Sequence, residues 1–140
     1  MNIDSIKDGI VIDHIKAGCA MKIYELLGLD KQDVSVAIIK NVSSRKLGKK
    51  DIIKVDADIP VDLDVIGFID PDATVNIIKD GVLIKKYTVD MPEKLVNVIS
   101  CKNPRCITTC EQELAQIFNL TDRENKVYRC AYCETKASIN

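Results

Sequence analysis

Four cysteines near the end of this chain constrain its fold more than any other feature. They form two pairs, Cys101-x4-Cys106 and Cys130-x2-Cys133, separated by twenty-three residues. A short loop between paired cysteines directs both thiolates to one ion, and four tetrahedral thiolates are a favoured structural site for zinc. Four protein ligands leave no position open for water or substrate. The pattern therefore predicts one structural Zn²⁺ per chain and no catalysis by the metal.

Other uses of the cysteines stay open from spacing alone. Paired cysteines also form disulfides, mainly in oxidising compartments, and iron–sulfur clusters use differently spaced cysteine runs. Cys19 and Cys110 are left over, and Cys110 is close enough in sequence to Cys106 to serve as a substitute ligand. The C-terminal segment has few large apolar residues. We therefore expect the metal to supply most of its folding free energy, on the order of 10 kcal/mol.

Length and charge exclude several classes of partner. The chain has 140 residues, a formal net charge of −1, and 46% hydrophobic and 29% charged residues. This composition is typical of a soluble globular protein, and it lacks the field that attracts nucleic acid or anionic membranes. The apolar runs are too short to span a bilayer, and the N-terminus does not have the pattern of a secretion signal. We expect a cytoplasmic protein whose partners include neither nucleic acid nor membrane.

The composition along the chain predicts two domains, 1–92 and 93–140. The first carries one cysteine and alternates strand-like with helix-like segments, and the polar segment 43–50 is typical of an exposed loop. In order, it is expected to form strand 10–15, helix 21–27, strands 33–41 and 51–55, a helix from Pro60 to Ile69, strand 73–78, an Asp80-Gly81 hairpin turn and strand 82–89. This is the split βαβ order, so the predicted fold class is α+β with a ferredoxin-like (βαββαβ) sandwich.

The second domain is expected to be small and all-β. Strand 95–99 leads into the first cysteine pair and strand 126–129 into the second, whereas 111–120 is either a short helix or irregular. Two cysteine-containing turns, each preceded by a short strand, are typical of a zinc-ribbon-like module.

Four segments together resemble a known family. Val11 to Ile15, Gly48 to Lys54, Ala73 to Asn76 and the cysteine pattern occur in the same order in the regulatory chain of aspartate carbamoyltransferase. The resemblance covers nearly the whole chain and implies a subunit without catalytic activity. It implies an N-terminal domain that pairs with a second copy and binds CTP, UTP and ATP, and a zinc domain that contacts the catalytic chains. The expected role is allosteric control of pyrimidine biosynthesis, with regulatory dimers joining catalytic trimers.

The resemblance also assigns roles to individual residues. The implied nucleotide-binding positions are Ile3, Asp4, Ile6, Val11, Asp13, His14, Lys54, Asn76, Ile78 and Lys86. The implied contacts with the catalytic chain are Asn103, Arg105 and Glu134. Gly81 and Thr88 stand where well-studied members have a tyrosine and an arginine. Loss of an arginine removes a bidentate phosphate contact worth about 1.5–3 kcal/mol, and alternation along the strand argues against Lys85 replacing it.

Three other functions compete with this interpretation. A nucleic-acid-binding zinc ribbon would need a basic, aromatic surface, but acidic residues offset the basic ones in 93–140. An enzyme would need a nucleophile–base constellation or a phosphate loop, and the chain has one histidine and no glycine-rich loop. A ferredoxin-like amino-acid sensor remains an alternative because the fold serves many ligands.

Overall fold

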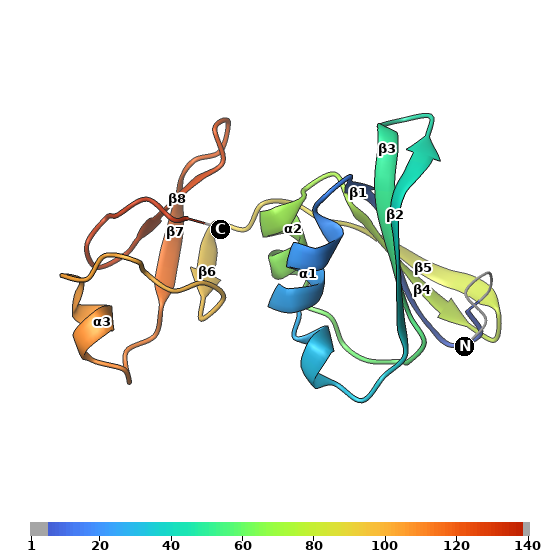
Figure 1. Ribbon diagram of the computed structural model, residues 1–140, viewed down its shortest axis with the longest axis horizontal. Helices are drawn as coiled ribbons and strands as arrows, with labels where there is room; N and C mark the ends of the chain where they lie inside the picture. Colours follow the sequence, from blue (N-terminus) through green and yellow to red (C-terminus); the bar gives the residue numbers. More distant parts are fainter. Residues whose placement is uncertain (1–5, 139–140) are drawn as a thin grey trace. The chain divides into compact units, whose positions relative to one another are not determined.

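The computed structural model describes residues 6–138, and the chain divides into two compact units, Met1–Asp90 and Met91–Asn140. The first unit is a five-stranded antiparallel sheet with two helices on one face (Figure 1). Its strand order is β2-β3-β1-β4-β5. The elements are β1 (Gly9–Lys16), α1 (Ala20–Leu26), the 3-10 helix η1 (Leu29–Lys31), β2 (Val36–Ser44), β3 (Gly48–Val55), α2 (Leu63–Ile69), β4 (Thr74–Lys79) and β5 (Val82–Thr88). The first four strands have the ferredoxin-like arrangement, and β5 extends it, so the predicted α+β class is confirmed.

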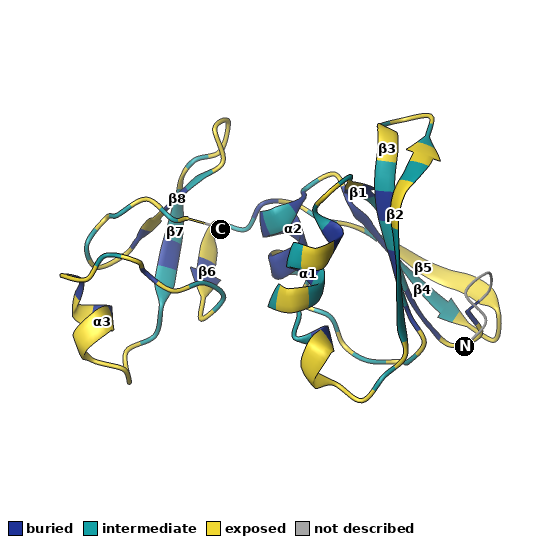
Figure 2. Cartoon of the chain, viewed as in Figure 1, coloured by how far each residue is buried: buried dark blue, intermediate teal, exposed yellow. Residues whose placement is uncertain are grey.

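Alternation along the strands separates a buried face from an open one. Ile10, Ile12 and Val75 are buried against the helices, where Ile23 of α1 and Ile66 of α2 complete the core. The intervening residues of the same strands point to the opposite face, which no helix of the described part of this unit covers (Figure 2).

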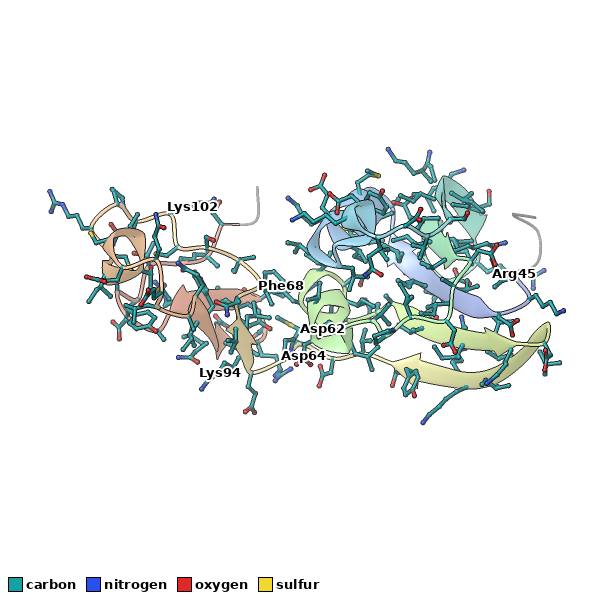
Figure 3. The ribbon with its side chains drawn as sticks, turned by 90° about the horizontal axis from the view of Figure 1, so that it is seen from below. Arg45, Asp62, Asp64, Phe68, Lys94 and Lys102 are labelled. Atoms are coloured by element: carbon teal, nitrogen blue, oxygen red, sulfur yellow. The ribbon has the colours of Figure 1, made fainter. Side chains whose placement is uncertain are left out.

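Helix α2 is positioned by a cap and a glycine. Asp62, labelled with Asp64 in Figure 3, accepts a hydrogen bond from the Asp64 backbone N–H at 3.0 Å. This cap explains why the helix begins at Leu63 and not at Pro60, as the sequence suggested. At Gly67 a Cβ atom would lie 1.9 Å from the carbonyl oxygen of Asp90. Only glycine therefore allows the end of the unit to pack on the helix.

Three β-bulges interrupt the sheet. The register changes between Ile12 and Ile15 in β1 and between Ile39 and Val42 in β2. His14 and Asn41 lie within these bulges with positive φ angles of 58° and 63°. The third bulge places Ile84 of β5 between the pairs Ile77–Lys85 and Ile78–Leu83.

The prediction of an exposed loop at residues 43–50 is wrong. Most of that segment belongs to a hairpin in which Val42, Ser43 and Ser44 of β2 pair with Lys50, Lys49 and Gly48 of β3. Only 45–47 form the turn. Backbone pairing holds this tip although both of its strands are polar.

The second unit is a three-stranded antiparallel sheet, β6-β7-β8, with one short helix. Its elements are β6 (Lys94–Val96), α3 (Ile107–Cys110), β7 (Ile117–Asp122) and β8 (Val127–Cys130). Buried Leu95, Phe118 and Tyr128 form its apolar centre. The predicted strand 95–99 ends at Val96, because Asn97 has a φ of 56°, and 111–120 contains most of a strand and no helix. Within residues 6–138, no helix combines the length and the apolar character needed to cross a membrane.

Candidate functional site

The four predicted zinc ligands converge in the second unit. Cys101 and Cys106 flank the loop before α3, whereas Cys130 ends β8 and Cys133 lies in the turn that follows. Their sulfur atoms all lie within 4.8 Å of one another, with Cys101–Cys133 at 3.6 Å and Cys106–Cys130 at 3.7 Å. Four thiolates at the usual Zn–S distance form a tetrahedron with edges of about 3.8 Å. A disulfide would need about 2.05 Å, so the thiol positions fit a tetrahedral metal and not a cross-link.

Hydroxyl groups lie beside two of the sulfurs. Thr108 Oγ1 is 3.1 Å from Cys106 Sγ, and Thr135 Oγ1 is 3.2 Å from Cys133 Sγ. Burial raises the pKa of the Cys101 thiol, whereas hydrogen bonds from Thr135 lower the pKa of Cys133. A divalent cation offsets the cost of burying these thiolates and stabilises the deprotonated form of all four. Cys110 is exposed at the end of α3 and is not one of the four clustered thiols.

The three residues predicted to contact a catalytic chain lie around this centre. Asn103 Oδ1 accepts from the Arg105 backbone N–H at 3.0 Å, and Asn103 Nδ2 donates to Thr135 Oγ1 at 3.2 Å. The side chain of Asn103 is thus used within the loop. Arg105 and Glu134 are exposed. Glu134 has a φ of 63°, and its carbonyl oxygen accepts from Arg129 at 3.1 Å.

The first unit carries a second cluster of predicted residues on its open face. Val11 of β1 lies opposite Lys54 of β3 on one side and Asn76 of β4 on the other, and Asn76 lies opposite Lys86 of β5. These four residues, which we call the nucleotide row, cross four adjacent strands. With strands about 4.8 Å apart, the backbone span of the row is about 14 Å.

A hollow of about 440 Å³ opens beside the nucleotide row. Its lining residues are Ile6, Val11, Asp13, Ile52, Lys54, Ile78 and Gly81. Five of the ten predicted nucleotide-binding residues therefore line one cavity. Asn76 adjoins it through a hydrogen bond from its Nδ2 atom to the Val11 carbonyl oxygen at 3.4 Å. Ile3 and Asp4 lie outside the described residues.

Asp13 and His14 lie at the bulge of β1. Lys50 Nζ is 2.9 Å from Asp13 Oδ1, and the His14 backbone N–H donates to the same oxygen at 2.6 Å. Burial raises the pKa of Asp13, but the hydrogen bond from Lys50, the His14 N–H and the nearby positive charge more than offset it, and the pKa is lowered. His14 Nδ1 lies 3.2 Å from Thr74 Oγ1. Asp13 is therefore a carboxylate already held by a cation.

The two lysines of β5 point in opposite directions. Lys86 lies opposite Asn76, whereas Lys85 lies opposite Ile77 on the helix side, with its Nζ atom 4.7 Å from the centre of the Tyr87 ring. Thr88, opposite Thr74, is on the same side as Lys86. Lys85 consequently does not take the place of the arginine that is missing at Thr88.

Comparisons with known proteins decide the family. The model for "Aspartate carbamoyltransferase regulatory chain, allosteric domain" matches residues 1–90, and the model for the metal binding domain of the same chain matches residues 93–140. The chain belongs to the aspartate carbamoyltransferase regulatory chain family. Proteins of that name in three bacteria are similar to it. The Clostridium tetani protein is 50% identical over 96% of this chain and 94% of its own length. The Clostridium botulinum protein is 49% identical over 96% of this chain and 92% of its own length. The Bifidobacterium longum protein is 43% identical over 99% of this chain and 100% of its own length.

Membership confirms several predictions. The chain is a regulatory subunit of aspartate carbamoyltransferase without catalytic activity, and a catalytic chain is its implied partner. The second unit matches a metal binding domain, and its four clustered thiols lie at ligand distance from one another. Together these findings support a structural zinc site formed by the four cysteines named above.

Sequence reasoning missed two residues of β3. Lys50 lies in the segment predicted to be a loop, and its contact with Asp13 depends on pairing between strands. The sequence predicts a strand at Asp51 without marking the residue as special, yet Asp51 is fully buried. Charged residues beside the Ile52–Ile53 run were the available signal, since a charge within a buried strand requires partners.

Proposed function

We propose that the open face of the first unit binds nucleoside triphosphates, CTP, UTP or ATP, and that binding regulates an attached catalytic chain in pyrimidine biosynthesis. The nucleotide row carries the proposal, because it brings an apolar side chain, an amide and two cations together on one face of the sheet, beside one cavity. Family membership supports the same conclusion.

The chemistry of the row suits such a ligand. Lys54 and Lys86 supply positive charge for phosphate oxygens, which a triphosphate requires. Val11 and Ile78 offer apolar contact for a base, and Asn76 can both donate to and accept from base or sugar groups. Asp13 can accept hydrogen bonds from ribose hydroxyls, with Ile6 and His14 completing the surroundings.

Adjacent lysines on β5 provide the test. Lys86→Ala and Lys54→Ala should each weaken CTP and ATP binding by about 10- to 100-fold, because a charge-assisted contact is worth about 1.5–3 kcal/mol. Lys85→Ala removes the same charge one residue away on the opposite face and should leave the dissociation constant unchanged. Calorimetric titration of the full zinc-loaded chain measures the dissociation constants of all three variants. Equal effects of Lys85→Ala and Lys86→Ala would contradict a site on the open face.

We also infer that the zinc unit is the part that joins the catalytic trimers. Arg105 and Glu134 are exposed beside metal-anchored loops, and Asn103 orders the loop that presents Arg105. A surface held by a metal loses little conformational entropy when it docks. The same unit exposes Ile107, Leu114 and Tyr132, which offer apolar contact area.

Assembly can be measured directly. The chain is mixed with catalytic trimers from the same source and sized by light scattering after gel filtration. We expect a larger complex that is lost with a zinc chelator and weakened by Arg105→Ala or Glu134→Ala, whereas Lys94→Ala on β6 serves as the exposed control. A complex that survives removal of zinc would exclude this role for the unit.

Pairing of two regulatory chains through their N-terminal domains is proposed on related grounds. The outer strand β5 exposes Val82, Leu83 and Ile84, and apolar residues on an outer strand are often covered by another chain. Sedimentation of the zinc-loaded chain at several concentrations tests for a dimer, and a monomer throughout would refute it. Cytoplasmic location stays a prediction.

A further inference from the structure

Asp51 is a buried carboxylate that lies beside the nucleotide row without belonging to it. It sits on β3 between Lys50 and Ile52, and its relative exposure is 0%. Lys50 and Ile52 contribute to the open face, so alternation directs Asp51 to the helix side of the sheet. A carboxylate persists in a core only where hydrogen bonds replace the water that it has lost.

Three backbone N–H groups supply those hydrogen bonds. Gly18 and Ala20 donate to Oδ2 at 3.0 and 3.2 Å, and Asn41 donates to Oδ1 at 2.9 Å. Gly18 belongs to the turn between β1 and α1, and Ala20 is the first residue of α1. The third lies in the bulge of β2. One side chain on β3 therefore ties together segments from both neighbouring strands.

The two bulges flank the same stretch of β3. In β1 the register changes opposite Asp51 to Ile53, and in β2 it changes opposite Lys50 to Ile52. Each bulge has a carboxylate that accepts a backbone N–H. Asp13 accepts from His14 on the open face, and Asp51 accepts from Asn41 on the helix side. Lys50 forms an ion pair with Asp13, and the backbone conformation of residues 50–53 determines where its side chain points.

We propose that Asp51 is a positioning residue for nucleotide binding. By holding the β2 bulge and the β1–α1 turn against β3, it fixes the backbone from which Lys50 reaches Asp13 and Lys54 reaches the cavity. Asp51 does not touch the ligand. This inference rests on the proposed nucleotide site.

Asp70 provides a matched control for the test. It is also a buried carboxylate in the first unit. It accepts from the backbone N–H groups of Lys16, the last residue of β1, at 2.6 Å and of Asp72 at 3.0 Å, but it lies after α2 and bonds to neither bulge. Asp51→Asn and Asp70→Asn should each lower the melting temperature by about 10 °C. Titrations of the full zinc-loaded chain with CTP and ATP, well below either melting temperature, then separate positioning from stability. Asp51→Asn should raise the dissociation constant about tenfold, and Asp70→Asn should leave it unchanged.

The outcomes are distinct. Wild-type affinity in Asp51→Asn, or equal weakening in Asp70→Asn, would overturn the role of Asp51 while leaving the site in place. Failure of the wild-type chain to bind either nucleotide would instead remove the site itself. If Asp51→Asn does not fold, Asn41→Val tests the proposal instead. Asn41 is exposed and has a positive φ, which a β-branched residue tolerates poorly, so the substitution should distort the β2 bulge. Distortion of that bulge should also weaken binding, and unchanged binding would overturn the proposal.

Discussion

Thr135 connects a zinc ligand to the loop that carries the other cysteine pair. Its hydroxyl lies 3.2 Å from Cys133 Sγ and accepts from Asn103 Nδ2 at the same distance. When Cys133 is a thiolate, the hydroxyl can donate its proton to the sulfur, which stabilises the metal-bound form. Groups that bond to ligands in this way hold the ligand in the orientation that the metal requires.

Replacing Thr135 should therefore weaken zinc binding. Thr135→Val keeps the shape but removes the hydroxyl, and we expect zinc affinity to fall about 10- to 100-fold in competition with a coloured chelator. Thr121→Val is the control, because Thr121 Oγ1 donates to the Val127 carbonyl oxygen and not to a sulfur. An unchanged affinity for Thr135→Val would show that the hydroxyl does not support the site.

The Asp13–Lys50 pair gives a pH-dependent prediction. The pKa of Asp13 is lowered in the folded chain, so the pair stabilises the fold above the ordinary value of 3.8, and that contribution is lost as the pH falls through the lowered pKa. Lys50→Met should raise the Asp13 pKa in a carboxyl NMR titration. Both side chains are partly exposed, so the variant should lose only about 0.5–1 kcal/mol of stability at neutral pH. An unchanged pKa would mean that Lys50 does not stabilise the carboxylate.

At the scale of elements, the cap of α2 is a separate source of stability. Asp62→Ala leaves the Asp64 N–H without its acceptor and should cost about 1 kcal/mol, which corresponds to about 4–8 °C in melting temperature for a unit of this size. Asp62→Asn retains an acceptor and should remain close to the wild type. Thermal unfolding followed by circular dichroism compares the two, and equal losses would mean that charge, not capping, matters at this position.

Element prediction succeeded where hydrophobic pattern decided the structure. β1, α1 and β4 each have apolar residues at the period of the element, and one face of each is buried. The tip of the β2–β3 hairpin carries no such signal, since Ser43, Lys49 and their neighbours are polar on both faces. β7 is not evident from the sequence because polar Asn119 interrupts its apolar residues and because its first four residues fall at the end of 111–120, where the preceding residues are mostly polar.

At the scale of the whole molecule, the two units should respond differently to loss of zinc. The metal supplies folding free energy on the order of 10 kcal/mol in small zinc modules, whereas the first unit has its own apolar core. Chelation, or Cys130→Ser, should therefore collapse the NMR signals of 91–138 into the unfolded range and leave those of the first unit dispersed. Dispersed signals from a metal-free second unit would refute the dependence.

The sequence predicted the zinc centre of the second unit more completely than the candidate binding site of the first. Cysteine spacing sufficed for the zinc centre, because sequence neighbours supply both halves of it. The nucleotide row depends on register between four strands, so sequence could name Lys54 and Lys86 only through resemblance to a family. The Asp13–Lys50 contact and the hydrogen bond from Asn41 to Asp51 arise at two bulges, which residue patterns do not reveal.

The bulge at Ile84 separates β5 into two parts with different register. Towards the turn, Leu83 pairs with Ile78, and beyond the bulge Lys86 keeps its position opposite Asn76. A residue gained or lost near the turn can be absorbed at the bulge without moving Lys86. Gly81, which lines the cavity, lies on the turn side of the bulge. The length of the hairpin tip and the position of Lys86 on the open face are thus structurally independent of one another.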